Sequence, residues 1–320
     1  MVHRKSMATY FSTTPFLVLI LFISSSIIPT IRSKRIGAGD IIRDGQTFAS
    51  ENDIFVLGFF DPKSNTESNS LESKYLGIWY NFSTDMIVWV GNREYPITHS
   101  FGVLQLTVDG QLIISQNQSN TTTTTDDIVW SSNSRNSMVV NPVLTLLDSG
   151  NLIITNGTDD GGAIIWQSFD YPTDTLLPNM KLGFNKKTGL QRYMSAWKQL
   201  NDPSPSDFVL KMDTTGLHEL YTASNSLKQR RYGSWNGEWF VGNPKMKTDN
   251  VLSTSFVDNE EEVFFSINVR TIDLYTKLSL FPNHTLSRKF KNNKNGSRWV
   301  SYATTIDACD NYNHLKELIL

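Results

Sequence analysis

The stretch VLTLLDSGNLIIT (143–155), followed by IIWQSF (164–169), decides the fold that the sequence predicts. Two apolar runs flank an Asp-Ser-Gly turn, which is the pattern of an antiparallel hairpin, and a short tryptophan-bearing strand follows. The same order occurs upstream, where VLQLTVDGQLIIS (103–115) leads to IVWSSN (128–133). A spacing of about 30 to 40 residues between such copies indicates repeated supersecondary units.

The hairpin strands have one face directed inward. Side chains alternate across a strand, so Leu104, Leu106 and Val108 should share the buried face of one copy. Leu144 and Leu146 should do the same in the next copy. A tryptophan in every copy is expected to fill the core where the strands converge.

The rest of the chain follows this pattern in weaker form. The weaker copies and the additional strands are IFVLGFF (54–60), KYLGIWY (74–80), MIVWVGNR (86–93), FVLKMDTTGLHELYT (208–222) with RYGSWNG (231–237), and TKLSLFPNHTLSRKF (276–290) with GSRWVSY (296–302). No long stretch has helical periodicity, so the predicted class is all-β, built from short antiparallel sheets. The prolines of NDPSPSD (201–207) predict a linker there.

Composition excludes some partners. The 320 residues carry a formal net charge of −2, which provides no basic field for nucleic acid. The five histidines are scattered along the chain and there is a single cysteine, so neither a metal site nor a cofactor is expected. No nucleophile elbow or phosphate-binding glycine loop occurs, and we expect no enzymatic activity from this chain.

The first 33 residues resemble an export signal. Arg4 and Lys5 precede the apolar run PFLVLILFISSSIIPTI (15–31), which is too short and too interrupted for a spanning helix. We therefore expect residues 1–33 to be cleaved, leaving a secreted chain without a membrane span. Six glycosylation sequons are consistent with secretion: Asn81, Asn117, Asn120, Asn156, Asn283 and Asn295.

Several motifs together are specific to one family. They are TFASENDIFVLGFF (47–60), YLGIWY (75–80), IVWVGNREYPI (87–97), LTLLDSGNLII (144–154), IIWQSFDYPTDTLLPNMKLGFN (164–185), YGSWNGEWF (232–240) and ACDNYN (308–313). In this order they resemble the ectodomain of plant G-type lectin S-receptor-like serine/threonine kinases and S-locus glycoproteins, over about residues 36–313.

The resemblance implies a domain organisation. It predicts a bulb-type lectin domain at 34–160, in the β-prism arrangement of three small sheets, and a second lectin-like unit or S-locus glycoprotein domain at 161–305. Residues 306–320 would be the start of an EGF-like segment, here a disordered tail. In the family, further EGF-like, PAN, transmembrane and kinase regions follow. Cys309 is then expected to be a free thiol, able to form an intermolecular bond.

The family's mannose motif, Gln-x-Asp-x-Asn-x-Val-x-Tyr, is degraded here. Its positions hold Thr107, Asp109, Gln111, Ile113 and Ser115 in one copy, and Leu147, Ser149, Asn151, Ile153 and Thr155 in the other. Asp109, Gln111 and Asn151 are the candidate sugar-binding residues, although for Asp109 and Asn151 a role as plain turn residues is the preferred interpretation. Mannose binding should be weak, because each lost hydrogen bond costs about 1 kcal/mol.

The predicted function is a secreted recognition module that binds a glycan, a peptide or a receptor partner, with pollen recognition or defence signalling implied by the resemblance. A homodimer or a heterodimer with receptor kinases is among the expected assemblies. One alternative is a working mannose lectin. Another is the ectodomain fragment of an incomplete gene product whose full-length form is a receptor kinase. A third, an extracellular glycoside-processing enzyme, would require two carboxylates converging in a cleft.

Overall fold

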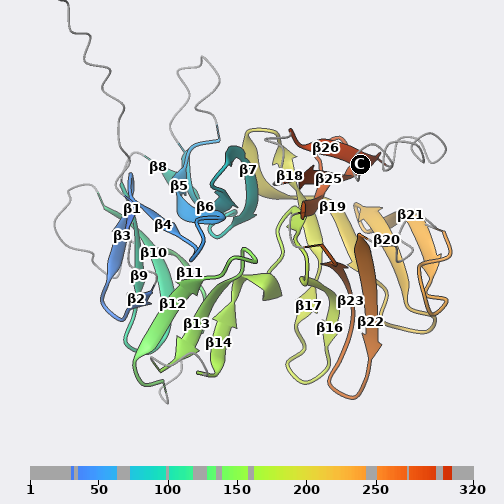
Figure 1. Ribbon diagram of the computed structural model, residues 1–320, viewed down its shortest axis with the longest axis horizontal. Helices are drawn as coiled ribbons and strands as arrows, with labels where there is room; N and C mark the ends of the chain where they lie inside the picture. The colour runs from blue at the N-terminus through green and yellow to red at the C-terminus, as the bar shows by residue number, and fades with distance from the viewer. Residues whose placement is uncertain are drawn as a thin grey trace, which may run out of the picture.

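The computed structural model describes residues 30–31, 35–62, 73–98, 101–117, 128–134, 139–157, 162–242, 251–271, 274–292 and 298–304. Over these ranges the chain forms strands, and regular helix is limited to the 3-10 turn η2 (Ser168–Asp170). The strands assemble into six short sheets in two groups that lie side by side (Figure 1). The predicted all-β class is confirmed.

The first group contains three sheets formed by β1 to β14. One has the order β1 (Thr30–Ile31), β4 (Thr47–Ala49), β5 (Phe55–Phe60), β6 (Ser73–Tyr80) and β7 (Ser83–Val90), with β8 (Ile97–Thr98) also on β6. The second has the order β11 (Ile128–Ser131), β10 (Leu112–Asn117), β9 (Phe101–Leu106) and β3 (Ile41–Arg43). The third has the order β14 (Ile164–Gln167), β13 (Leu152–Asn156), β12 (Pro142–Leu146) and β2 (Ile36–Gly37).

The second group has the same plan with β15 to β26. Its first sheet has the order β15 (Thr175–Leu176), β24 (Leu274–Leu280), β25 (Leu286–Asn292) and β26 (Val300–Thr304). Its second has the order β17 (Gln191–Arg192), β16 (Lys181–Asn185), β23 (Glu262–Val269) and β22 (Leu252–Asp258). Its third has the order β18 (Met194–Gln199), β19 (Asp202–Met212), β20 (Glu219–Ser224) and β21 (Leu227–Ser234).

The two clearest sequence copies are also copies in backbone register. Leu106 pairs with Leu112 across one hairpin, and Leu146 pairs with Leu152 across the other. Each hairpin's second strand then pairs with the tryptophan strand, and in both cases the register shifts after the residue opposite the tryptophan. The predicted repeat of hairpin plus tryptophan strand is therefore confirmed.

Three tryptophans meet at the centre of the first group. Trp89, Trp130 and Trp166 come from β7, β11 and β14, one from each sheet. Their ring centroids are 6.1 to 6.3 Å apart in edge-to-face contacts, a favourable geometry for aromatic pairs. Large rings thus close the space between three sheets, as the tryptophan pattern predicted.

Two expectations are wrong. Val108 is 76% exposed rather than inward, because β9 ends at Leu106 and Val108 lies in the turn that follows. Residues 201–207 are not a linker: Pro203 and Pro205 belong to β19. That part of β19 pairs only with β18, across two register shifts, whereas β20 pairs from Val209 onward. Proline is tolerated in this part of β19 because no second neighbouring strand would need the backbone N–H that proline lacks.

The domain limits 34–160 and 161–305 remain predictions. β14 lies in a sheet of the first group, beyond residue 160. β1 pairs in parallel with β4, although its residues fall in the predicted signal segment 1–33. The expected tail, 306–320 with Cys309, lies outside the described residues.

Candidate functional site

The structure places two predicted sugar-binding residues on one turn. Asp109 and Gln111 follow β9, where the Thr107 hydroxyl contacts the Asp109 carboxylate and accepts a 3.0 Å hydrogen bond from the Gln111 backbone N–H. The Gln111 side-chain amide contacts the hydroxyl of Ser131 on β11. These polar groups therefore already bind the protein's own atoms.

Asn151, the third candidate, lies on a different sheet and is only 7% exposed. Its Nδ2 donates to Gln167 Oε1 at 2.9 Å, and its Oδ1 accepts from Ser168 Oγ and the Phe169 N–H, both at 3.2 Å. The amide thus joins the start of β13 to the end of the tryptophan strand β14. Its sugar-binding role, like those of Asp109 and Gln111, stays a prediction.

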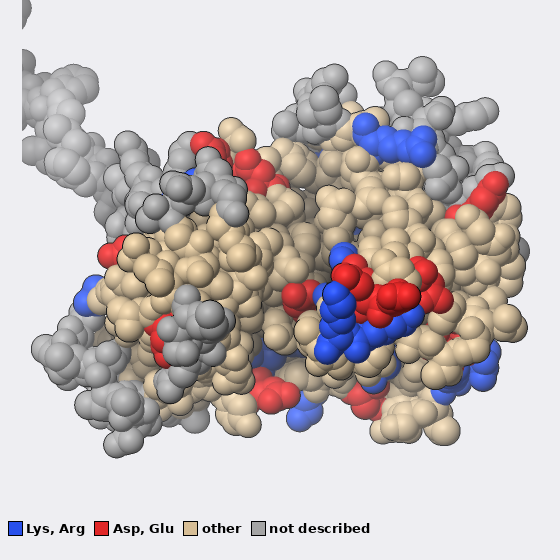
Figure 2. Space-filling view, turned by 90° about the horizontal axis from the view of Figure 1, so that it is seen from below, with Lys and Arg blue, Asp and Glu red and all other residues tan. Residues whose placement is uncertain are grey.

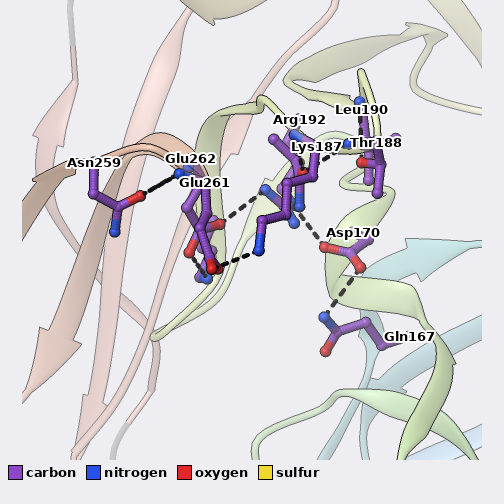
Figure 3. Close-up of polar contacts among 11 residues, drawn as sticks. Gln167, Asp170, Lys187, Thr188, Leu190, Arg192, Asn259, Glu261 and Glu262 are labelled. Atoms are coloured by element: carbon purple, nitrogen blue, oxygen red, sulfur yellow. Dashed lines mark hydrogen bonds and ion pairs between the residues drawn. The ribbon is translucent and has the colours of Figure 1, made fainter.

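From Gln167, the partner of Asn151, a chain of polar contacts continues through Asp170 into the second group of sheets (Figure 3). Gln167 Nε2 donates to Asp170 Oδ2 at 3.1 Å, and Arg192 Nε donates to Asp170 Oδ1 at 2.6 Å. Arg192 also lies 3.4 Å from Glu262, which forms a 2.6 Å ion pair with Lys181. The Arg192 side chain is only 5% exposed, so it is not accessible to a ligand. Its contacts instead connect the two groups of sheets.

More ion pairs extend this chain to the surface. Lys186 pairs with Asp258 at 2.7 Å and Lys187 with Glu261 at 2.6 Å. Charged side chains of both signs gather on this underside of the molecule (Figure 2). Exposed pairs such as these contribute little to stability, and their mutual neutralisation disfavours a role in binding a charged partner.

A hollow beside the three tryptophans is better suited to a ligand. This tryptophan pocket has a volume of about 360 Å³, within the usual range for ligand sites. Trp89, Trp130 and Trp166 line it together with Tyr95 and Tyr171. The tyrosines are 60% and 47% exposed, and the Tyr171 ring stacks on Trp166 at 5.9 Å between centroids. The lining also includes the polar residues Arg93, Glu94, Ser131, Ser132 and Asn133.

Arg93 also fixes the position of this pocket relative to the second group. Its guanidinium donates to Pro203 O at 2.7 Å, to Ser195 Oγ at 2.9 Å, to Ser195 O at 3.1 Å and to Ala196 O at 3.0 Å. Burial lowers the pKa of Arg93, and electrostatic attraction to the carboxylate of Asp174 partly opposes that effect. Trp89 adds a 3.0 Å bond from Nε1 to Tyr171 O.

Tyr95, Tyr171 and Arg93 were not among the binding residues predicted from the sequence. A signal was present, since each tyrosine begins a Tyr-Pro dipeptide shortly after a tryptophan strand. The repeat predicted that the tryptophans pack, but not that one end of their cluster is open. That opening depends on how the loops after β7 and β14 are oriented.

Three sequons have described surroundings. Asn81 and Asn283 are exposed on turns, and Asn156 is half-buried at the end of β13. Asn81 Nδ2 donates to Asp53 O at 3.0 Å, a bond compatible with a glycan because a glycosylated amide keeps one N–H. Asn117 ends β10, while Asn120 and Asn295 lie outside the described residues.

Within the described ranges, no group of three or more histidine, cysteine, aspartate or glutamate side chains is arranged to hold a metal. The same ranges contain no helix with the length and apolarity needed to cross a bilayer.

Structural comparison finds limited similarity to two solved lectins. A monomeric mannose-binding lectin from Gastrodia elata covers 42% of this chain and 96% of its own, at 20% identity and a TM-score of 0.29. The two-domain, fetuin-binding lectin of Scilla campanulata covers 85% of this chain and 100% of its own, at 16% identity and a TM-score of 0.24.

Sequence comparison is more informative. Residues 86–198 match the D-mannose binding lectin family and residues 230–316 match the S-locus glycoprotein domain. A receptor-like serine/threonine-protein kinase of Arabidopsis thaliana is 37% identical over 278 residues, which is 85% of this chain and 31% of the relative. An S-locus-specific glycoprotein of Brassica oleracea is 34% identical over 301 residues, which is 93% of this chain and 65% of the relative.

The chain thus spans about a third of the kinase relative and about two thirds of the glycoprotein. The matched portion consists of the lectin and S-locus glycoprotein regions. This chain therefore belongs to the family of the G-type lectin S-receptor-like kinases and S-locus glycoproteins, whose lectin and S-locus glycoprotein regions it shares.

Proposed function

We propose that this chain is a secreted extracellular recognition module that binds a carbohydrate through the tryptophan pocket. The observation that carries the proposal is the pairing of two exposed tyrosines with a 360 Å³ aromatic hollow. Aromatic faces stack on the apolar faces of sugar rings, and the surrounding hydroxyl, amide and carboxylate groups offer hydrogen bonds to sugar hydroxyls. The mannose-motif positions are less suited, because Asn151 and Gln111 already bind protein groups.

The binding test uses the secreted glycoprotein on an array of N-glycans and cell-wall oligosaccharides. Tyr171→Ala should weaken binding of the best glycan at least about fivefold, since each stacked ring contributes about 1 kcal/mol or more. Tyr193→Ala is the matched control, because Tyr193 is 38% exposed and lies outside the pocket. Glycan binding that survives Tyr171→Ala unchanged would contradict the proposed site.

A mannose lectin remains the second candidate, favoured by the match to the D-mannose binding lectin family. We expect calorimetry to give a mannose affinity no stronger than the millimolar range, about −4 kcal/mol. Micromolar binding that is lost in Asp109→Ala, Gln111→Ala or Asn151→Ala would establish the lectin instead. If only peptides or receptor ectodomains bind, the partner is a protein, and signalling would occur through a homodimer or a complex with receptor kinases.

Secretion and glycosylation have their own test. Mass spectrometry of the protein expressed in plant cells should find an N-terminus near Lys34 and glycans on Asn81 and Asn283, which are exposed. An intact Met1 with unmodified sequons would show that the chain is not exported.

A further inference from the structure

We propose that a second, smaller pocket in the other group of sheets binds an oxyanion: a carboxylate, sulfate or phosphate group. It has a volume of about 170 Å³ and lies where β20 and β21 meet the turn before β25. Thr222, Gln229, Arg230, Tyr232 and His284 supply its polar lining. None of these residues lines the tryptophan pocket, so the proposal is independent of the proposed function.

The Tyr232 hydroxyl is the feature that calls for a ligand. Tyr232 is 1% exposed, and its Oη has no hydrogen-bond partner among the residues that the structure describes. Buried polar atoms are nearly always satisfied, because an unpaired one keeps the full cost of its desolvation. A ligand oxygen in the adjoining pocket would accept this O–H.

The other polar groups are mostly donors. The Arg230 guanidinium lies 5.4 Å from the centre of the Tyr232 ring, and Thr222, 4% exposed, adds a hydroxyl. Gln229 contributes an amide and His284 an imidazole. Among the described residues, no carboxylate lines the pocket, so none of them would repel a ligand oxyanion at contact distance. Guanidinium and hydroxyl donors around one space are typical of oxyanion sites.

The histidine is held in a fixed position. His284 stacks flat on Phe208, with ring centroids 4.5 Å apart and an interplanar angle of 5°. Its backbone has φ of +63°, and the turn is closed by a 3.0 Å bond from its N–H to Phe281 O. The carboxylate of Asp207 is already bound to Ser224 Oγ and the Asn225 N–H, both at 2.9 Å.

The size of the pocket limits what can enter. Its volume is below the roughly 300 Å³ at which sites for whole small molecules begin. Only one acidic group therefore fits, either free or at the end of a larger ligand.

The test titrates the whole secreted chain with sodium sulfate, phosphate and acetate at constant ionic strength. Binding is followed by the NMR signals of His284 and by the melting temperature. We expect saturable shifts in the wild-type protein, and at least about tenfold weaker binding in Arg230→Gln, since a charge-assisted hydrogen bond is lost. The order of sulfate, phosphate and acetate distinguishes tetrahedral from planar acidic groups.

The matched control is Arg231→Gln. It removes the same charge from the next residue, whose side chain is 63% exposed and pairs with Glu219 outside the pocket. It should leave anion binding unchanged. Tyr232→Phe should weaken binding severalfold and raise the melting temperature without anion, because an unpaired hydroxyl is removed. Equal anion responses in Arg230→Gln and Arg231→Gln, or no saturable shift in the wild type, would overturn the proposal.

Discussion

Arg93 shows how one side chain joins the two groups of sheets. Its donors reach backbone carbonyls of Ser195, Ala196 and Pro203 from three directions. A guanidinium can do this because its five N–H groups have a fixed planar arrangement, which a lysine lacks. The residue is 7% exposed, so water cannot replace these bonds if the side chain is shortened.

Arg93→Ala should therefore lower the free energy of unfolding by about 3 kcal/mol, because buried carbonyls lose their donors. Arg93→Lys should recover only part of that loss. Urea denaturation measures both. Arg231→Ala, a surface variant, should cost less than about 1 kcal/mol; similar losses for Arg93→Ala and Arg231→Ala would show that Arg93 is dispensable.

Lys277 on β24 is a buried lysine whose charge is unfavourable. Burial lowers its pKa from 10.5 to about 8, and Lys289 on the paired strand adds to the shift, while Asp174 and Asp85 oppose it. Between these pH values the folded chain binds fewer protons at Lys277 than the unfolded chain. The free energy of unfolding therefore rises with pH between about 8 and 10.5. Below about pH 8, the folded protein bears the full cost of burying the charged lysine.

Lys277→Met should consequently stabilise the protein at pH 7, by on the order of 3 kcal/mol if the whole shift is relieved. The gain should shrink as pH rises from about 8 towards 10. Unfolding free energies of wild type and variant at several pH values measure the difference. A gain independent of pH would mean that packing, not charge, explains it.

At the scale of elements, the turn glycines decide how closely the hairpins pack. Gly150 has φ of +85°, in the left-handed region that favours glycine, and a Cβ there would lie 2.6 Å from Leu177 Cδ1. Gly39 has a similar φ of +88° but nothing within 4 Å of the equivalent position. Comparing alanine substitutions at Gly39 and Gly150 therefore separates the cost of backbone strain from the cost of steric crowding.

Gly39→Ala should cost about 1 kcal/mol from backbone strain alone. Gly150→Ala should cost at least about 1 kcal/mol more, because Leu177 and Phe55 must move. Chemical denaturation of both variants gives the comparison. Equal costs would indicate that Leu177 is displaced freely.

At the scale of the whole molecule, the two groups share one hydrophobic core. Buried residues from Ile36 to Phe290 form a single cluster that crosses between the groups. Tyr80 meets Tyr275 at 5.8 Å between ring centroids, and Trp299 Nε1 donates to Ser83 Oγ at 3.0 Å. Domains joined by such contacts are expected to unfold together.

Calorimetry should therefore show one transition, with matching calorimetric and van't Hoff enthalpies. Trp299→Ala together with Arg93→Ala should divide it into two, since both remove contacts between the groups. Two separate transitions in the wild-type protein would contradict a shared core.

The sequence alone was sufficient for local features, because alternation and turn chemistry act over neighbouring residues. It predicted the hairpins at 103–115 and 143–155, the tryptophan strands, the all-β class and the core role of the tryptophans. It was wrong about Val108, which is exposed because β9 ends at Leu106. It was also wrong about residues 201–207, which form a strand because that part of β19 has no second neighbouring strand to exclude its prolines.

Only the tertiary structure decided which distant residues meet. β2 and β3 join sheets formed by β12 and β9, a pairing that the local pattern does not contain. The buried bonds of Asn151 and the opening beside the tryptophans likewise depend on loops and sheets brought together by folding, as does the Tyr232 hydroxyl, which has no partner among the described residues. Motif spacing identifies residue types that can bind a sugar. Whether their hydrogen-bond donors and acceptors are free to do so depends on the neighbours that folding places beside them.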